Sequence, residues 1–151
     1  MDYVYVDGGR HAAGYTGQAR DCVTRAIAIA TGHAYQDVYD ALNTLAKKER
    51  TGPRKRSVSH ARTGVYTSTY RKYLAGLGWH WTPTMHIGQG CTVHFTAEEL
   101  PHGRLIVTIS RHLVAVIDGV VHDTSMPDPR GGTRCVYGYF TGPGLPSDRG
   151  C

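Results

Sequence analysis

The segment spanning residues 105–124 constrains the fold more than any other part of the chain, because it holds two apolar runs and a turn signal. Residues 105–110 are rich in β-branched side chains, which is typical of a buried strand. A second apolar run covers residues 112–117, and the Asp118-Gly119 pair after it favours a two-residue hairpin turn. Residues 120–124 then run back along the second strand. We therefore expect an antiparallel sheet built around this hairpin.

The register of this hairpin brings one imidazole close to one carboxylate. The turn places Val114 opposite Asp123, and alternation of side chains along a strand puts His112 on the same face as Val114. His112 and Asp123 are then diagonal neighbours. Asp118 lies roughly 20 Å from His112, at about 3.3 Å per residue, and is a turn residue. Asp123 is therefore the carboxylate placed to orient His112.

A cysteine stands at the start of an apolar, alanine-rich run near the N-terminus. Asp21 is a good helix N-cap, so Cys22 is expected at the first helical position. A thiol there faces unpaired N–H groups and the positive end of the helix dipole, which lower its pKa and favour the nucleophilic thiolate. A Cys in this place can also be a small buried side chain on an amphipathic helix.

Together, a thiol at a helix start, an imidazole on a strand and a carboxylate on the next strand are the parts of an activated nucleophile. The imidazole takes the thiol proton, and the carboxylate fixes the imidazole tautomer. The alternative is structural: His112 is a satisfied histidine at a strand entrance, and Asp123 is a hydrogen-bonded carboxylate at a strand end.

The Asp21-Cys22 helix start, followed 90 residues later by the strand His112-Leu-Val-Ala-Val and a hairpin return to Asp123, resembles papain-like cysteine peptidases. The compact bacterial and phage type, related to the bacteriocin-processing peptidases, is the most similar. The resemblance implies an α+β fold with N-terminal helices packed on an antiparallel sheet. It implies Cys22 as nucleophile, His112 as base and Asp123 as orienting acid. It also implies a Gln before the Cys as an oxyanion-hole donor, for which Gln18 is the local candidate, and phage origin, with action in the host cytoplasm.

The whole chain, residues 1–151, is expected to form a single domain. Apolar spacing and turn residues predict strands at 2–6, 79–83 and 135–140, helices at 21–31, 34–48 and 68–77, and one helical turn at 96–99. A Gly- and Pro-rich tail, about 141–151, is expected to be flexible. This order of helices and then strands indicates an α+β protein.

The four cysteines are widely spaced and contain no Cys-x-x-Cys pair, which indicates reduced thiols and a cytoplasmic protein. A zinc site of Cys91, His94 and Cys135 lacks the spacing of a known ligand pair, so we expect no metal and no cofactor. No nucleotide-binding glycine motif is present. We expect no membrane association, because no apolar run approaches the ~20 residues of a membrane span and the N-terminus does not resemble a secretory signal.

A basic stretch lies between the second and third expected helices, and the chain carries a formal net charge of +5. Basic residues interleaved with tyrosines over residues 47–73 can follow a phosphate backbone and stack on bases. They can also form a solvated loop, or rim a cleft and attract an acidic substrate. The candidate contacts with substrate or nucleic acid are Arg54, Lys55, Arg56 and Arg62.

Two functions follow from these patterns. The first is a cysteine hydrolase that cleaves a peptide, isopeptide or related amide bond in a protein or peptide through a thioacyl intermediate, with acyl transfer as a variant. The second is a phage-encoded binding module of the same fold, which grips a host protein or nucleic acid through residues 47–73 without turnover.

Overall fold

The structure, a computed structural model, describes residues 1–143 and is an α+β arrangement of three helices on a mostly antiparallel sheet. The six-stranded sheet has the order β1-β7-β6-β5-β8-β2, and only the β1–β7 pair is parallel. Its strands are β1 (Asp2–Tyr5), β2 (His80–Pro83), β5 (Arg104–Ile109), β6 (His112–Ile117), β7 (Val120–Asp123) and β8 (Gly138–Thr141). A separate hairpin, which the sequence patterns did not predict, joins β3 (Met85–His86) to β4 (Gly90–Cys91).

The predicted hairpin is present with the predicted register. Ile117 pairs with Val120, and Ala115 pairs with His122. Asp118 and Gly119 both have positive φ, as a two-residue turn between twisted strands requires. Because β5 and β8 extend the sheet on the other side of β6, the segment that constrained the fold most forms the centre of the sheet.

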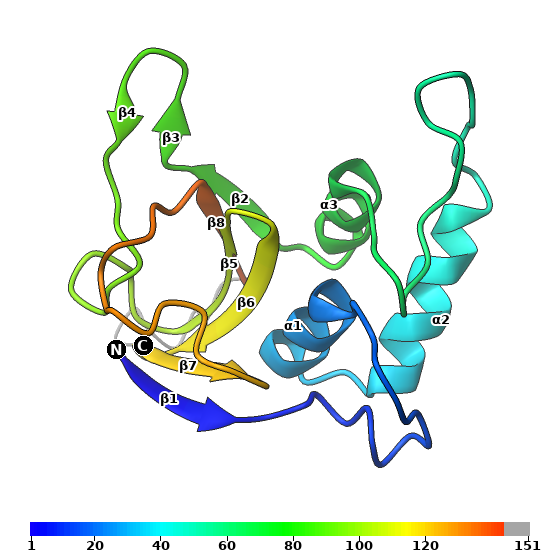
Figure 1. Cartoon of the computed structure of the whole chain (residues 1–151), viewed down its shortest axis with the longest axis horizontal. Helices are drawn as coiled ribbons and strands as arrows, with labels where there is room; N and C mark the ends of the chain where they lie inside the picture. The colour runs from blue at the N-terminus through cyan, green and yellow to red at the C-terminus, as the bar shows by residue number, and fades with distance from the viewer. Residues whose placement is uncertain (144–151) are drawn as a thin grey trace.

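The three helices cover one face of the sheet (Figure 1). They are α1 (Cys22–Thr31), α2 (Tyr35–Ala46) and α3 (Thr67–Gly76), close to the predicted ranges. The small side chains of Ala26 and Ala30 let α1 approach β6, where Leu113 and Ala115 face the helices. Gly32, with a φ of 78°, ends α1, as the sequence predicted. Helix α1 therefore ends where the sequence predicted.

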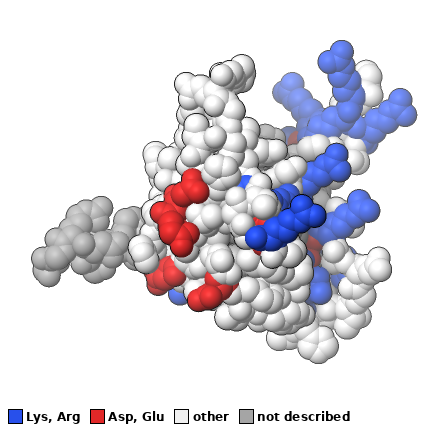
Figure 2. All heavy atoms as spheres, turned by 60° about the vertical axis from the view of Figure 1, so that its left-hand side comes forward, with Lys and Arg blue, Asp and Glu red and all other residues white. Residues whose placement is uncertain are grey.

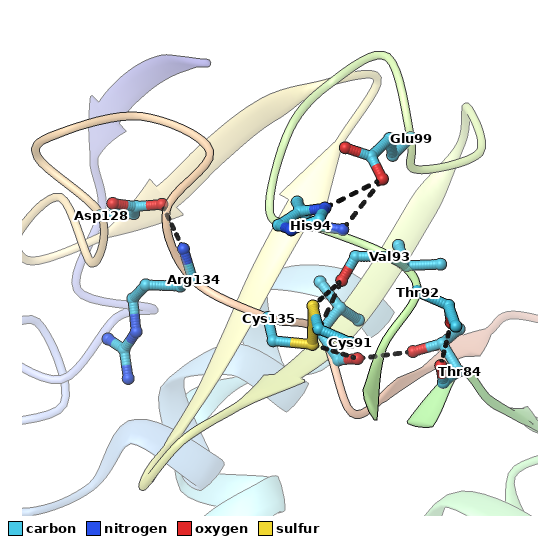
Figure 3. The surroundings of a disulfide bond; sticks show 10 residues. Thr84, Cys91, Thr92, Val93, His94, Glu99, Asp128, Arg134 and Cys135 are labelled. Atoms are coloured by element: carbon cyan, nitrogen blue, oxygen red, sulfur yellow. Dashed lines mark hydrogen bonds and ion pairs between the residues drawn. A yellow bond between two sulfur atoms is a disulfide. The ribbon is translucent and has the colours of Figure 1, made fainter. Parts of the chain in front are cut away.

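The opposite face of the sheet is covered by segment 84–103, which contains the β3–β4 hairpin, and by segment 124–137, which contains no strand or helix (Figure 1). Phe95 and Val136, from those segments, pack on Val114 and Val116 of β6 in a second apolar cluster. The segments are joined by a disulfide between Cys91 and Cys135, shown in Figure 3. The expectation that these thiols are reduced is therefore wrong for this pair, and Cys91 and Cys135 do not form a zinc site with His94.

Two further expectations are corrected. Residues 96–99 form a bend and a turn that are not helical. The Thr96 hydroxyl nevertheless accepts a hydrogen bond from the Glu99 N–H, as in a helix cap. Thr141 belongs to β8, so the expected flexible tail does not begin there, and residues 144–151 lie outside the described residues. Among residues 1–143, no helix combines the length and apolarity needed to cross a membrane.

Candidate active site

The cysteine predicted as nucleophile is the first residue of α1. Asp21 occupies the N-cap position, but its carboxylate makes no capping hydrogen bond, so the predicted role of this side chain is wrong. Asp21 is buried and instead accepts hydrogen bonds from the guanidinium groups of Arg10 and Arg25 and from the Tyr35 hydroxyl. The Asp21 carboxylate therefore anchors the start of the helix through three side chains and does not cap the first helical N–H groups.

The predicted imidazole–carboxylate pair is formed. The Nε2 atom of His112 lies 2.6 Å from Oδ2 of Asp123. His112 is the first residue of β6 and Asp123 is the last residue of β7, so both side chains lie at the end of the sheet where α1 begins. Because Asp123 engages Nε2, the other ring nitrogen, Nδ1, is left for the thiol.

The Cys22 thiol is next to this imidazole. Burial raises the pKa of Cys22, but hydrogen bonding with the His112 side chain and with the Leu113 backbone N–H, together with the nearby charge of Arg25, brings the pKa below its ordinary value. The structure therefore brings together the three residues that the sequence selected, from three different elements, in a geometry that favours the thiolate.

The imidazole is shifted in the complementary direction. Burial lowers the pKa of His112, but hydrogen bonds with Asp123 and Cys22 outweigh it and raise the pKa to about 9. Burial raises the pKa of Asp123, whereas its bonds to His112, to the Thr124 backbone and to Arg25 lower it below the usual value. The lowered pKa of the Cys22 thiol and the raised pKa of the His112 imidazole both favour the thiolate–imidazolium form of the pair over the neutral form.

Arg25 connects both carboxylates of the site and was not singled out from the sequence. One guanidinium nitrogen donates to Asp21, and the other lies 3.2 Å from Oδ1 of Asp123. Arg25 is only 7% exposed, and it is the one charged residue in the Ala- and Ile-rich helix α1. That isolated charge, four residues after Asp21 on a buried helix face, is the signal that could have found it.

A cavity of about 440 Å³ opens onto Cys22 and His112. Its apolar lining includes Val23, Tyr70 and Leu113. Substrate-sized space is therefore in contact with both the thiol and the imidazole.

Gln18, the candidate oxyanion donor, is exposed and lines a neighbouring cavity of about 740 Å³ together with Arg10 and Arg25. That cavity contains neither Cys22 nor His112. The structure does not bring Gln18 into the cavity of the thiol, and its oxyanion role stays a prediction.

The basic candidates separate into two groups. The Arg62 guanidinium donates to the backbone oxygens of Thr16 and Gln18, so it fastens the loop that leads into α1. Lys55 pairs with Glu49 and lies 4.5 Å from the centre of the Tyr66 ring. The remaining candidates, Arg54 and Arg56, are exposed. Figure 2 shows Lys and Arg side chains gathered on one side of the visible surface and Asp and Glu on another.

No cluster of three metal-binding side chains occurs within the part of the chain that the structure describes. Comparison with known proteins found no family model, no curated protein and no solved structure that matches this chain. The function is therefore argued from the site alone.

The raised pKa of His112 predicts a specific pH dependence of stability. A histidine with a folded-state pKa of about 9 and an unfolded pKa near 6.5 contributes stability that is fully present below pH 6.5 and is lost as the pH rises to 9. We expect the difference in unfolding free energy between the wild type and His112→Gln to shrink across this range in urea titrations. In the Cys22→Ser control, which lacks the thiolate, the loss is expected at lower pH. A difference that grows between pH 6.5 and 9 would contradict the assignment.

Arg25 predicts a large stability effect because its removal leaves two buried carboxylates without their shared partner. Arg25→Met is expected to lower the free energy of unfolding at neutral pH by about 3–5 kcal/mol, as for a broken buried ion pair. The loss should be smaller in acid, where protonation of Asp123 removes its ion pair with Arg25. Arg56→Met, at an exposed position, is the matched control and should change stability by less than about 0.5 kcal/mol. Equal effects of the two variants in urea unfolding would rule out the bridging role.

Proposed function

We propose that this chain is a cysteine hydrolase of papain-like architecture that acts on a peptide, isopeptide or related amide bond. The observation that carries the proposal is the contact between the Cys22 thiol, at a helix start, and the His112 imidazole, which Asp123 holds from the other side. The order of the three residues along the chain, on a helix and then on two adjacent strands, supports the papain-like assignment.

The chemistry follows from the two charge states. The Cys22 thiolate attacks the carbonyl carbon, a C–S bond forms, and the carbonyl oxygen becomes an oxyanion near the free N–H groups at the start of α1. Protonated His112 then gives its proton to the leaving nitrogen as the C–N bond breaks, which leaves a thioester and neutral imidazole. His112 next takes a proton from water, which hydrolyses the thioester and releases the acid. An amine in place of water gives acyl transfer by the same intermediate.

Labelling of the thiol tests this assignment. An ordinary thiol is only a few per cent thiolate at pH 7, so Cys22 is expected to react with iodoacetamide about tenfold or more faster than Cys151 in the same chain. The pH at which labelling of Cys22 reaches half its maximal rate should lie below that of Cys151, and the rate should fall strongly in His112→Gln. Peptide mass spectrometry separates the two sites, and Cys151→Ser provides a single-thiol background. Equal rates at Cys22 and Cys151 would refute an activated nucleophile.

Turnover separates a hydrolase from a binder that keeps a reactive thiol. With p-nitrophenyl acetate, the hydrolase releases a burst of nitrophenolate, forms an acyl adduct on Cys22 and continues beyond one equivalent. Cys22→Ala should lose the burst, whereas Arg56→Gln should keep it. One equivalent of nitrophenolate without further release would favour the non-hydrolytic alternative.

A second candidate function, nucleic-acid binding, is favoured by one observation. The 47–66 connection between α2 and α3 projects from the body of the protein (Figure 1) and carries the exposed Arg54 and Arg56. Against it, Lys55 and Arg62 already make internal contacts. The segment therefore offers fewer free cations than its sequence indicates.

The salt dependence of binding tests this second function. If Arg54 and Arg56 contact phosphates of a single-stranded oligonucleotide, the logarithm of the affinity falls with the logarithm of salt concentration by roughly 0.7 per contact. The slope should decrease by that amount for each arginine changed to Gln in fluorescence anisotropy titrations. Arg130→Gln, exposed on the opposite side of the sheet, is the control and should leave the slope unchanged. Salt-independent binding would remove the electrostatic interpretation.

A further inference from the structure

Two arginines line the cavity that contains the thiol. Arg20 lies two residues before Cys22, and Arg111 lies directly before His112. The side chains that line this cavity include no carboxylate. Arg20 also lines the neighbouring cavity, where Arg10 and Arg25 are both paired with Asp21, but among residues 1–143 neither Arg20 nor Arg111 takes part in an ion pair. The cavity of Cys22 therefore holds two positive charges that no described carboxylate neutralises.

The backbone at one of these arginines is strained. Ser110 and Arg111 form the two-residue connection between Ile109 and His112, which pair directly across β5 and β6. Arg111 has a φ of 56°, a left-handed conformation that costs roughly 1–2 kcal/mol for a residue with a Cβ. Asp118, the other non-glycine residue with positive φ among the described residues, accepts a hydrogen bond from the Gly103 N–H. The Arg111 side chain makes no such contact within residues 1–143; the two-residue turn between β5 and β6 imposes its backbone conformation.

We propose that the substrate carries a carboxylate next to the bond that Cys22 attacks, and that Arg20 and Arg111 bind this carboxylate. The inference rests on the proposed hydrolase function. Guanidinium groups bind carboxylates through paired, charge-assisted hydrogen bonds. Glycine is the usual residue at a turn position with positive φ, and strained non-glycine residues cluster at functional sites. Arg111 at the edge of a reactive cleft fits this description.

The lining of the cavity favours a peptide over a polyanion. Beside the two arginines it is largely apolar, with Val23, Tyr70 and Leu113, which suits the side chains of a short peptide. Arg54 and Arg56, the cations expected to follow a phosphate backbone, do not line it. The substrate class is therefore a peptide with an acidic residue flanked by apolar residues at the cleavage point.

Two alkylating agents measure the local charge without knowledge of the substrate. In both reactions the thiolate forms a C–S bond and iodide leaves, but iodoacetate is anionic and iodoacetamide is neutral. The readout is the rate constant for iodoacetate divided by the rate constant for iodoacetamide, both measured at Cys22 in the Cys151→Ser background. Changing either arginine to Gln is expected to lower this ratio about three- to fivefold, the effect of one charge a few ångströms away in water. Arg111→Lys should keep most of the ratio, and Arg54→Gln, which removes a charge outside the cavity, should leave it unchanged.

The variant Arg111→Gly separates loss of the charge from loss of folding. Glycine relieves the left-handed backbone and removes the charge, so its thermal midpoint should equal or exceed that of the wild type while the ratio still falls. If iodoacetamide labels Cys22 rapidly but the ratio is insensitive to Arg20 and Arg111, the inference is overturned and the nucleophile assignment survives. If iodoacetamide labels Cys22 no faster than Cys151 in the wild-type chain, the proposed hydrolase function is refuted, and the inference that rests on it is refuted as well.

Protection of Cys22 from iodoacetamide identifies the source of the anion. We expect N-acetylglutamate N-methylamide to slow labelling of Cys22, and its glutamine counterpart to have a weaker effect. The advantage of the glutamate compound should disappear in the Arg20→Gln, Arg111→Gln double variant. Protection by inorganic phosphate or an oligonucleotide, with none by the glutamate compound, would overturn the peptide assignment.

Discussion

The buried guanidinium of Arg25 joins the start of helix α1 to the end of the sheet, and the candidate site depends on this connection. It donates to Asp21, which precedes the cysteine, and to Asp123, which holds the imidazole. Ion pairs between buried groups contribute little net stability, since desolvation offsets their attraction, but their geometry is restrictive. Because one guanidinium contacts both carboxylates, Arg25 links the start of α1 to the end of β7, where the thiol lies next to the imidazole.

This connection also distributes charge in a way that suits a nucleophile. Asp123 uses one oxygen for His112 and the other for Arg25 and the Thr124 N–H, so it remains ionised and keeps His112 protonated. A protonated imidazole in turn lowers the pKa of the Cys22 thiol, although burial of both groups opposes their charged forms. The site thus combines a network of paired charges with two arginines, Arg20 and Arg111, that form no ion pair among the described residues.

Much of the fold was predictable because its signals are local. The Asp118-Gly119 turn set the register of β6 and β7, Gly32 ended α1, and the periodic apolar residues marked three helices. The failures have physical causes as well. Asp21 makes ion pairs with distant Arg10 and adjacent Arg25 instead of capping the helix, and Cys91 meets Cys135 across 44 residues of chain. Propensity and spacing carry no information about partners as distant as Arg10 or Cys135, whereas the spacing of four residues between Asp21 and Arg25 was a local signal.

The sequence by itself determined the elements, the hairpin register and hence the closeness of His112 and Asp123, because turn geometry and side-chain alternation act over a few residues. Only the tertiary structure decided that the Cys22 thiol, 90 residues earlier, reaches that pair, that Arg25 bridges both carboxylates, and that Gln18 lines a different cavity. These contacts depend on how α1 packs against β6, and this packing depends on the shape of the whole core rather than on any local pattern.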